Sequence, residues 1–202
     1  MKVAEWMVKN PIVVTLDQRV QDCVDLMREH SIRHLPVVEN QRLIGLVTES
    51  DLREVFLASL VEDLTIEGVM ITEPLTVTPD TEIEDAAKLI YYHKIGGLPV
   101  VDEYSQVVGI LTVADLVEAF IELMGLLKSS SRIDVVLGDD PEAFERVSGL
   151  IRSNGGEVIS VGISGKDFGE KRTYFFRLEK CDVEAIASAL QEAGFKVISS
   201  TA

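Results

Sequence analysis

Apolar and polar residues follow one pattern that occurs twice in this 202-residue chain. It begins with apolar residues at i, i+3, i+4 and i+7, one face of an α-helix; they are Val20, Cys23, Val24 and Met27. The apolar runs LPVV (35–38) and LIGLVT (43–48), separated by polar ENQR, predict two strands joined by a turn. A second helix follows from about residue 50. With a strand near residue 12, the unit reads strand, helix, strand, strand, helix.

The same unit returns 63 to 64 residues later. Met7, Pro11 and Thr15 reappear as Met70, Pro74 and Thr78, LPVV reappears at 98–101, and GLVTESDL (45–52) is matched by GILTVADL (109–116). Self-similarity at a fixed period indicates a repeated structural unit. One unit of about 60 residues buries only a marginal core, so we expect two units packed about a pseudo-twofold axis, sheet against sheet.

The pattern changes after residue 127. The stretch LLKSSSR ends an apolar helix, predicted over 115–127, and indicates a linker at 128–132. Beyond it the pattern predicts a strand (133–138), a helix, two strands around the loop 166–171, a helix and a last strand. This βαββαβ order is that of the ferredoxin-like fold. The expected class is therefore α+β, with a domain at 1–127 and another at 133–202.

The repeated unit resembles a CBS domain, because both copies carry the LPVV strand and the ending Gly-apolar-apolar-Thr-x-x-Asp-Leu. Residues 1–127 thus resemble a tandem CBS (Bateman) module, with repeats at about 1–62 and 63–127. Residues 133–202 resemble an ACT domain, and this order is that of AcuB-like acetoin-utilisation proteins. The resemblance implies a regulatory ligand for the CBS pair, either an adenine nucleotide (AMP, ADP or ATP) or another adenosyl compound such as S-adenosylmethionine or NAD. It implies an amino acid for the ACT domain.

Thr48 and Asp51, with their counterparts Thr112 and Asp115, allow two interpretations. Thr-x-x-Asp before an apolar helical run is a capping box, which is a structural role. The same geometry would also direct free N–H groups and the positive end of a helix dipole toward a phosphate or ribose. The residues alone favour capping. The CBS resemblance favours contacts with ribose and phosphate.

Arg33 and His34 are the next candidates, because an anionic ligand of an acidic protein needs local positive charge. The CBS resemblance places a phosphate at Arg33; otherwise the two are a solvated arginine and a surface histidine. The second repeat has Gly96 and Gly97 at these positions, so we expect two unequal sites. The resemblance also implies adenine contacts near the first strand of each repeat, with core packing as the alternative, for Ile12, Val14, Leu75 and Val77.

In the ACT-like part, the usual ligand loop Asp-x-Pro-Gly reads Asp139-Asp140-Pro141-Glu142 here. Glu142 replaces the glycine, and its side chain and charge oppose the approach of an amino-acid carboxylate. A role in dimerisation is the alternative for this domain.

Composition narrows the partners. The chain has 34 acidic and 19 basic residues and a net charge of −15, which disfavours duplex DNA and anionic membranes. Cys23 and Cys181 form neither a disulfide framework nor a zinc site, so we expect a reducing compartment. No secretory signal or membrane span is apparent in the sequence. These features predict a cytoplasmic protein.

No nucleophile, base or metal constellation indicates an enzyme. We expect at least a homodimer, because the helix over 115–127 is more apolar than one buried stripe needs and a four-stranded βαββαβ sheet has free edges. A purely structural pairing module without a nucleotide is the alternative function.

Overall fold

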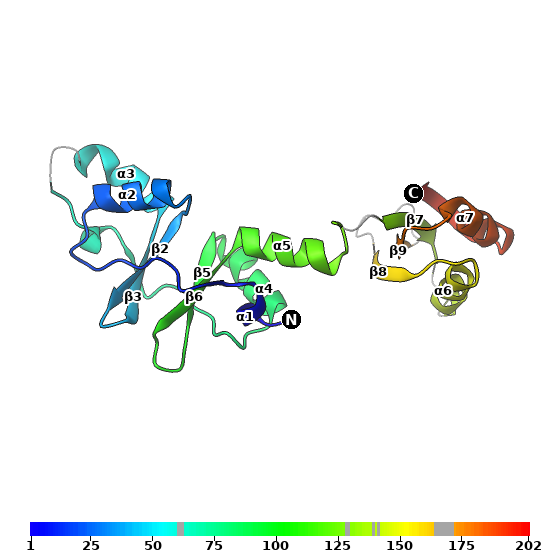
Figure 1. Cartoon of the computed structure of the whole chain (residues 1–202), viewed down its shortest axis with the longest axis horizontal. Helices are drawn as coiled ribbons and strands as arrows, with labels where there is room; N and C mark the ends of the chain where they lie inside the picture. The colour runs from blue at the N-terminus through cyan, green and yellow to red at the C-terminus, as the bar shows by residue number, and fades with distance from the viewer. Residues whose placement is uncertain (60–62, 128–129, 139, 141, 164–171) are drawn as a thin grey trace. The chain divides into compact units, whose positions relative to one another are not determined.

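The computed structural model describes residues 1–59, 63–127, 130–138, 140, 142–163 and 172–202. The chain divides into two compact units, Met1–Val117 and Glu118–Ala202, which can be followed by colour in Figure 1.

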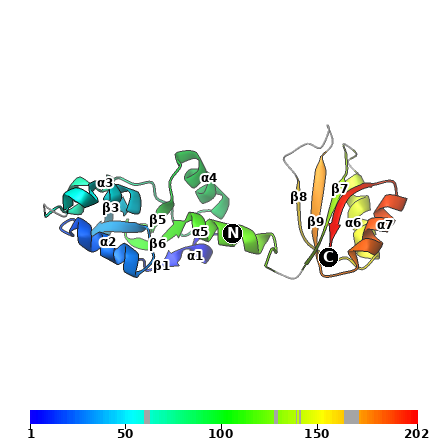
Figure 2. The ribbon, with the colours of Figure 1, turned by 90° about the horizontal axis from the view of Figure 1, so that it is seen from above.

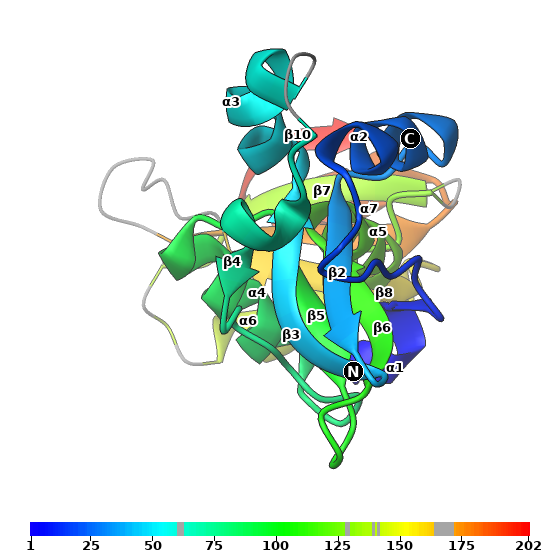
Figure 3. The same cartoon turned by 90° about the vertical axis from the view of Figure 1, so that its left-hand side faces the viewer.

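The strand predicted near residue 12 is not formed; Val14 makes an isolated parallel bridge to Val37 instead. The first repeat forms the other helices and strands that its pattern predicts. They are α2 (Val20–Glu29), β2 (His34–Glu39), β3 (Arg42–Thr48) and α3 (Glu49–Ser59). Strands β2 and β3 pair antiparallel, with His34 opposite Thr48. Helices α2 and α3 lie side by side (Figures 1 and 3). Apolar residues from all these elements form one core, which includes Val14, Val20, Cys23, Met27, Leu35, Val37, Val47, Leu52 and Ile66.

The second repeat has the same elements, which confirms the predicted duplication. They are α4 (Ile83–His93), β5 (Gly97–Val101), β6 (Val107–Thr112) and α5 (Val113–Leu123). Helix α5 ends four residues before the predicted end at residue 127. Gly125 takes a left-handed conformation (φ +66°), and its N–H donates to the Glu122 carbonyl at 2.9 Å. A left-handed glycine after the last turn is a common helix terminator.

The first strand of each repeat pairs with a strand of the other repeat. The sequence did not indicate this exchange. Strand β1 (Val8–Lys9) pairs with β6, and β4 (Ile71–Thr72) pairs with β3. The short helix α1 (Val3–Trp6) also contacts the second repeat, because the Val3 N–H donates to the Thr81 carbonyl at 2.9 Å. The 3-10 turn η1 (Ile66–Gly68) buries Ile66 in the first core. Each sheet of the CBS-like pair therefore combines two strands of one sequence repeat with the first strand of the other repeat.

The second unit has the predicted βαββαβ order. Its elements are β7 (Ser130–Val136), α6 (Ala143–Ser153), β8 (Val158–Ile163), β9 (Thr173–Glu179), α7 (Val183–Glu192) and β10 (Lys196–Thr201). The strands pair antiparallel in the order β10-β7-β9-β8, with α6 and α7 on one face (Figure 2). Residues 130–132 lie in β7, so the predicted linker is wrong there. Its residues 128 and 129 and the predicted loop 166–171 lie outside the described residues.

Candidate functional site

A cleft of about 1150 Å³ opens between the two repeats of the first unit. Its walls come from equivalent segments of each repeat: the segment ahead of the first helix, the loop after that helix, and the junction between the last strand and the last helix. Six of the ten predicted site residues line it, namely Ile12, Arg33, His34, Thr48, Leu75 and Thr112.

In both repeats the Asp carboxylate accepts from the Thr N–H, as the predicted capping box requires, and the reciprocal bond from the Asp N–H to the Thr hydroxyl is present in the first repeat, at 3.4 Å. Asp51 Oδ2 accepts from the Thr48 N–H at 2.9 Å and from Thr48 Oγ1 at 2.7 Å. Asp115 Oδ2 accepts the equivalent bonds from Thr112 at 2.6 and 2.7 Å. The two aspartates do not line the cleft. They hold the strand-to-helix junctions that carry Thr48 and Thr112 into it.

The start of α3 offers fewer free donors than the sequence predicts. The Glu49 N–H donates to the Arg33 carbonyl at 3.0 Å, and the Asp51 N–H lies 3.4 Å from Thr48 Oγ1. Ser50, between them, lines the cleft. A phosphate here would therefore rely on side chains more than on a ring of main-chain donors.

Val14 and Val77 do not reach the cleft, contrary to the prediction. Their side chains are 4% and 5% exposed, within the core. Val14 also bonds through its main chain, because its N–H donates to the Pro36 carbonyl and its carbonyl accepts from Val38. Core packing accounts for both valines, whereas Ile12 and Leu75, two positions earlier in each repeat, face the cleft.

His34 crosses from the first repeat to the second. A Cβ added at Gly96 would lie 2.7 Å from His34 Nε2, so the ring occupies the space that a side chain at position 96 would need. Burial lowers the pKa of His34, and the charge of Arg33 lowers it further, opposed by Asp51. The imidazole is therefore predominantly neutral at pH 7. The glycines of the second repeat and the histidine of the first form one packing arrangement.

Positive charge gathers in the cleft. Arg33, Arg53 and Lys94 line it together with Glu49 and Glu73, in a chain whose net charge is −15. Arg53 Nη2 donates to Glu49 Oε1 at 2.7 Å. The Arg33 guanidinium has no ion-pair partner among the residues that the structure describes. Such a cleft suits an anionic ligand, because opposite local charge concentrates it there.

The CBS domain family model matches residues 3–58 and 61–122, which is more than half of the chain. The chain belongs to the CBS-domain family. The cleft described above lies between its two CBS repeats.

Solved structures of other CBS pairs are similar to this part of the chain. CBSX2 in complex with AMP is 31% identical, with a TM-score of 0.55 over 60% of this chain and 96% of that one. The CBS pair of MJ0100, solved with 5′-methylthioadenosine and S-adenosyl-L-methionine, is 29% identical, with a TM-score of 0.55 over 59% and 95%. A protein assigned to acetoin utilization (AcuB) from Vibrio cholerae is 34% identical, with a TM-score of 0.57 over 62% and 94%.

Among curated relatives, the inosine-5′-monophosphate dehydrogenase of Methanocaldococcus jannaschii is 30% identical over 165 residues. That match takes in 80% of this chain, and the chain spans about a third (32%) of the length of the relative.

Two cationic residues of the CBS cleft were missed by the sequence interpretation. Lys94 caps α4 in a left-handed conformation (φ +57°), which brings it into the cleft two residues before Gly96. The second repeat therefore does place a cation in the cleft, although Gly96 and Gly97 had suggested that it lacks one. Arg53 lies one turn after Glu49 on α3, and this i, i+4 spacing was the available signal.

The loop of the second unit that resembles an ACT ligand loop is occupied by its own contacts. Asp140 accepts from the Glu142 N–H at 3.0 Å and from Arg146 Nη2 at 2.7 Å. Glu142 has a φ of −86°, which needs no glycine. Asp139 and Pro141 lie outside the described residues. No helix in the described part of the chain is long and apolar enough to cross a membrane.

Proposed function

We propose that this CBS pair is the sensor of a non-catalytic, cytoplasmic regulatory protein, and that its cleft binds an adenine nucleotide or another adenosyl ligand. The main support for this proposal is the cleft between the repeats, which is lined by Arg33, His34, Thr48 and Thr112 among others. AMP, 5′-methylthioadenosine and S-adenosyl-L-methionine in similar CBS pairs support an adenosyl ligand here. AMP, ADP, ATP, S-adenosylmethionine and NAD share that group.

In this proposal the roles follow from position. Arg33 and Lys94 attract the phosphates as cations, and Ile12 and Leu75 provide apolar contact for the base. Asp51 and Asp115 use Oδ2 for capping, and no hydrogen bond of the described residues uses their Oδ1 atoms. A carboxylate oxygen accepts from ribose hydroxyls. Although the two aspartates do not line the cleft, Thr48 and Thr112 beside them do, and in this proposal the ribose reaches Oδ1 next to these threonines, so that each aspartate serves both roles.

We further propose that residues 130–202 form an ACT-like, ferredoxin-like domain that pairs with a second copy and makes the protein a homodimer. The strand order β10-β7-β9-β8 supports the fold. Edge strand β8 supports the pairing, because Val158, Val161 and Ile163 give it an apolar character and Ile163 is 53% exposed. An apolar edge favours association with another strand. The contacts of Asp140 favour this role over amino-acid binding.

Calorimetric titration of the intact chain with AMP, ADP, ATP, NAD and S-adenosylmethionine tests the ligand proposal. Saturable binding of at least one is expected. No binding by any of them would support a structural pairing module instead, and turnover of a bound nucleotide would contradict the non-catalytic role.

A further inference from the structure

The two halves of the ligand cleft differ in polarity. Several polar residues of the first repeat line it and have no polar counterpart in the second repeat. These residues are Arg33, His34, Glu49, Ser50 and Arg53. At the equivalent positions the second repeat has Gly96, Gly97, Val113, Ala114 and Val117. The first half therefore presents charge and hydrogen-bonding side chains, whereas the second presents backbone and apolar side chains.

Groups suited to an adenosine, in contrast, occur in both halves. In each repeat an aspartate Oδ2 accepts two hydrogen bonds from the threonine three residues earlier, which leaves Oδ1 for a ribose. The residues are Thr48 with Asp51 and Thr112 with Asp115. Ile12 of the first repeat is matched by Leu75 of the second, and both line the cleft. The groups for ribose and base are thus duplicated, and those for phosphate are not.

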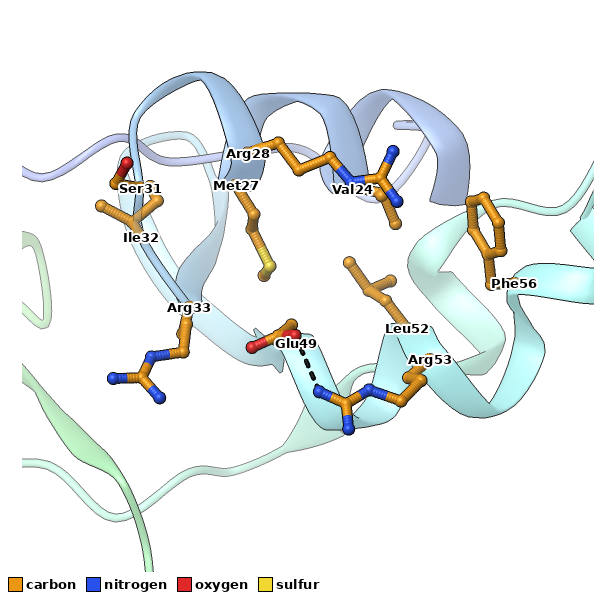
Figure 4. A pocket seen from close by; sticks show the side chains of 10 residues that line it. All are labelled: Val24, Met27, Arg28, Ser31, Ile32, Arg33, Glu49, Leu52, Arg53 and Phe56. Carbon is orange, nitrogen blue, oxygen red and sulfur yellow. Dashed lines mark hydrogen bonds and ion pairs between the residues drawn. The ribbon is translucent and has the colours of Figure 1, made fainter.

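The cations of the two halves are also unequal. Figure 4, which views the neighbouring groove between α2 and α3, shows the Arg33 guanidinium pointing away from the ion pair of Arg53 with Glu49. Arg33 has no ion-pair partner among the described residues, so its charge is available to a phosphate. The cation of the second repeat is Lys94, whose ammonium lies 4.2 Å from the centroid of the Tyr91 ring. This cation–π contact already engages the lysine.

His34 adds to the difference between the halves. A Cβ added at Gly96 would lie 2.7 Å from His34 Nε2, and one added at Gly97 would lie 3.5 Å from it. The imidazole therefore faces the two glycines of the second repeat. Burial lowers the pKa of His34, so that the ring is predominantly neutral at pH 7. The side chain that the first repeat places against these glycines brings no positive charge to them.

We propose that the two halves bind different adenosyl ligands: a phosphorylated nucleotide beside Arg33, and an adenosyl compound without phosphate beside Gly96 and Gly97. This inference rests on the proposed adenosyl function of the cleft and assigns a ligand class to each half. A phosphate that leaves water needs cations or donors in place of its hydration. Arg33 meets that need in the first half. An uncharged nucleoside needs no cation, because Asp115 and an apolar wall serve its ribose and base.

Calorimetric titration of the intact chain with AMP and adenosine tests this assignment. AMP alone should bind with a stoichiometry of one per chain, and the AMP-saturated chain should then bind one adenosine. Two equivalent AMP sites, or no adenosine binding by the AMP-saturated chain, would overturn the assignment. A chain that binds adenosine but not AMP would also overturn it and leave the adenosyl function in place. A chain that binds no adenosyl compound would overturn both.

Variants of the second repeat provide another measurement. Asp115→Ala should weaken adenosine binding to the AMP-saturated chain about tenfold, because the ribose loses its acceptor, and should change AMP affinity much less. Val117 is 50% exposed, and Val117→Arg, which restores the counterpart of Arg53, should create a second AMP site. Val117→Gln, which has similar length and no charge, is the matched control and should not. A folded Val117→Arg chain that still binds a single AMP would overturn the assignment.

Discussion

Replacement of Asp51 or Asp115 by alanine should separate the structural role of these residues from their ligand role. Each carboxylate accepts two hydrogen bonds from the threonine three positions earlier, and the two sets of distances are nearly identical. As caps the two should therefore be equivalent. As ligand contacts they should differ, because Arg33 lies beside the first site without an ion-pair partner among the described residues, whereas the cation of the second repeat, Lys94, lies 4.2 Å from the Tyr91 ring centroid.

The magnitude follows from the bonds that are lost. Loss of a helix N-terminal cap costs about 0.5–2 kcal/mol of stability. We therefore expect each variant to lower the free energy of unfolding by about 1 kcal/mol, which lowers Tm by roughly 2–4 °C for a chain of this length. Loss of a charge-assisted contact with the nucleotide costs about 1.5–3 kcal/mol, which is roughly ten- to a hundredfold in affinity. We expect that larger loss for Asp51→Ala and a smaller one for Asp115→Ala.

Urea unfolding and calorimetric titration with AMP measure the two effects. Asp25→Ala, which removes an exposed carboxylate from the surface of α2, should alter neither stability nor affinity appreciably. Unchanged stability in both cap variants would refute the capping role. Equal losses of AMP affinity would refute the asymmetry of the two sites. Unchanged AMP affinity in both variants would leave these aspartates as caps alone.

Three further predictions concern single side chains. Arg33→Ala should weaken AMP binding about tenfold and leave adenosine binding almost unchanged, because only AMP has a phosphate. Calorimetric titration measures both affinities, and a uniform loss for the two ligands would instead indicate a folding defect. Burial raises the pKa of the Cys23 thiol to about 11, so iodoacetamide at pH 8 should alkylate Cys181 first, by mass spectrometry, and rapid modification of Cys23 in the folded chain would contradict this. Because the native pKa of His34 is lowered, the unfolded chain binds the proton more tightly, and stability should fall as the pH drops below about 6.5. Urea unfolding of His34→Gln should show a smaller loss over that range, and an identical pH dependence would refute the assignment.

Much of the CBS pair could be predicted from local pattern. Helical spacing of apolar residues gave α2 and α4, and the runs around 35–48 and 98–112 gave the strand pairs, because one buried face imposes a period on the sequence. The Thr-x-x-Asp spacing gave both capping boxes for the same reason, since its partners are three residues apart. Duplication strengthened each assignment, because both copies had to satisfy it.

The cleft could not be predicted from local pattern, because it is formed by residues that lie far apart in the chain. The exchange of β1 and β4 depends on the pairing of Val8 with Ile110, 102 residues apart, and of Leu46 with Ile71, 25 residues apart. No local period encodes such pairs. Lys94, the left-handed C-cap residue of α4, lines the cleft, and the sequence pattern did not indicate that position. Local spacing also could not separate Val14, buried in the core, from Ile12, which faces the cleft.

The relation between His34 and Gly96 shows the division most clearly. The repeats differ at these positions in the amino-acid sequence, and this difference suggested a missing cation in the second repeat. The three-dimensional structure adds that packing is part of this difference, because a Cβ at Gly96 would lie 2.7 Å from Nε2 of the His34 ring, so that the ring would have to move to admit a side chain. Periodicity reports which residues share a face of one element, whereas steric exclusion between elements depends on how they are packed together.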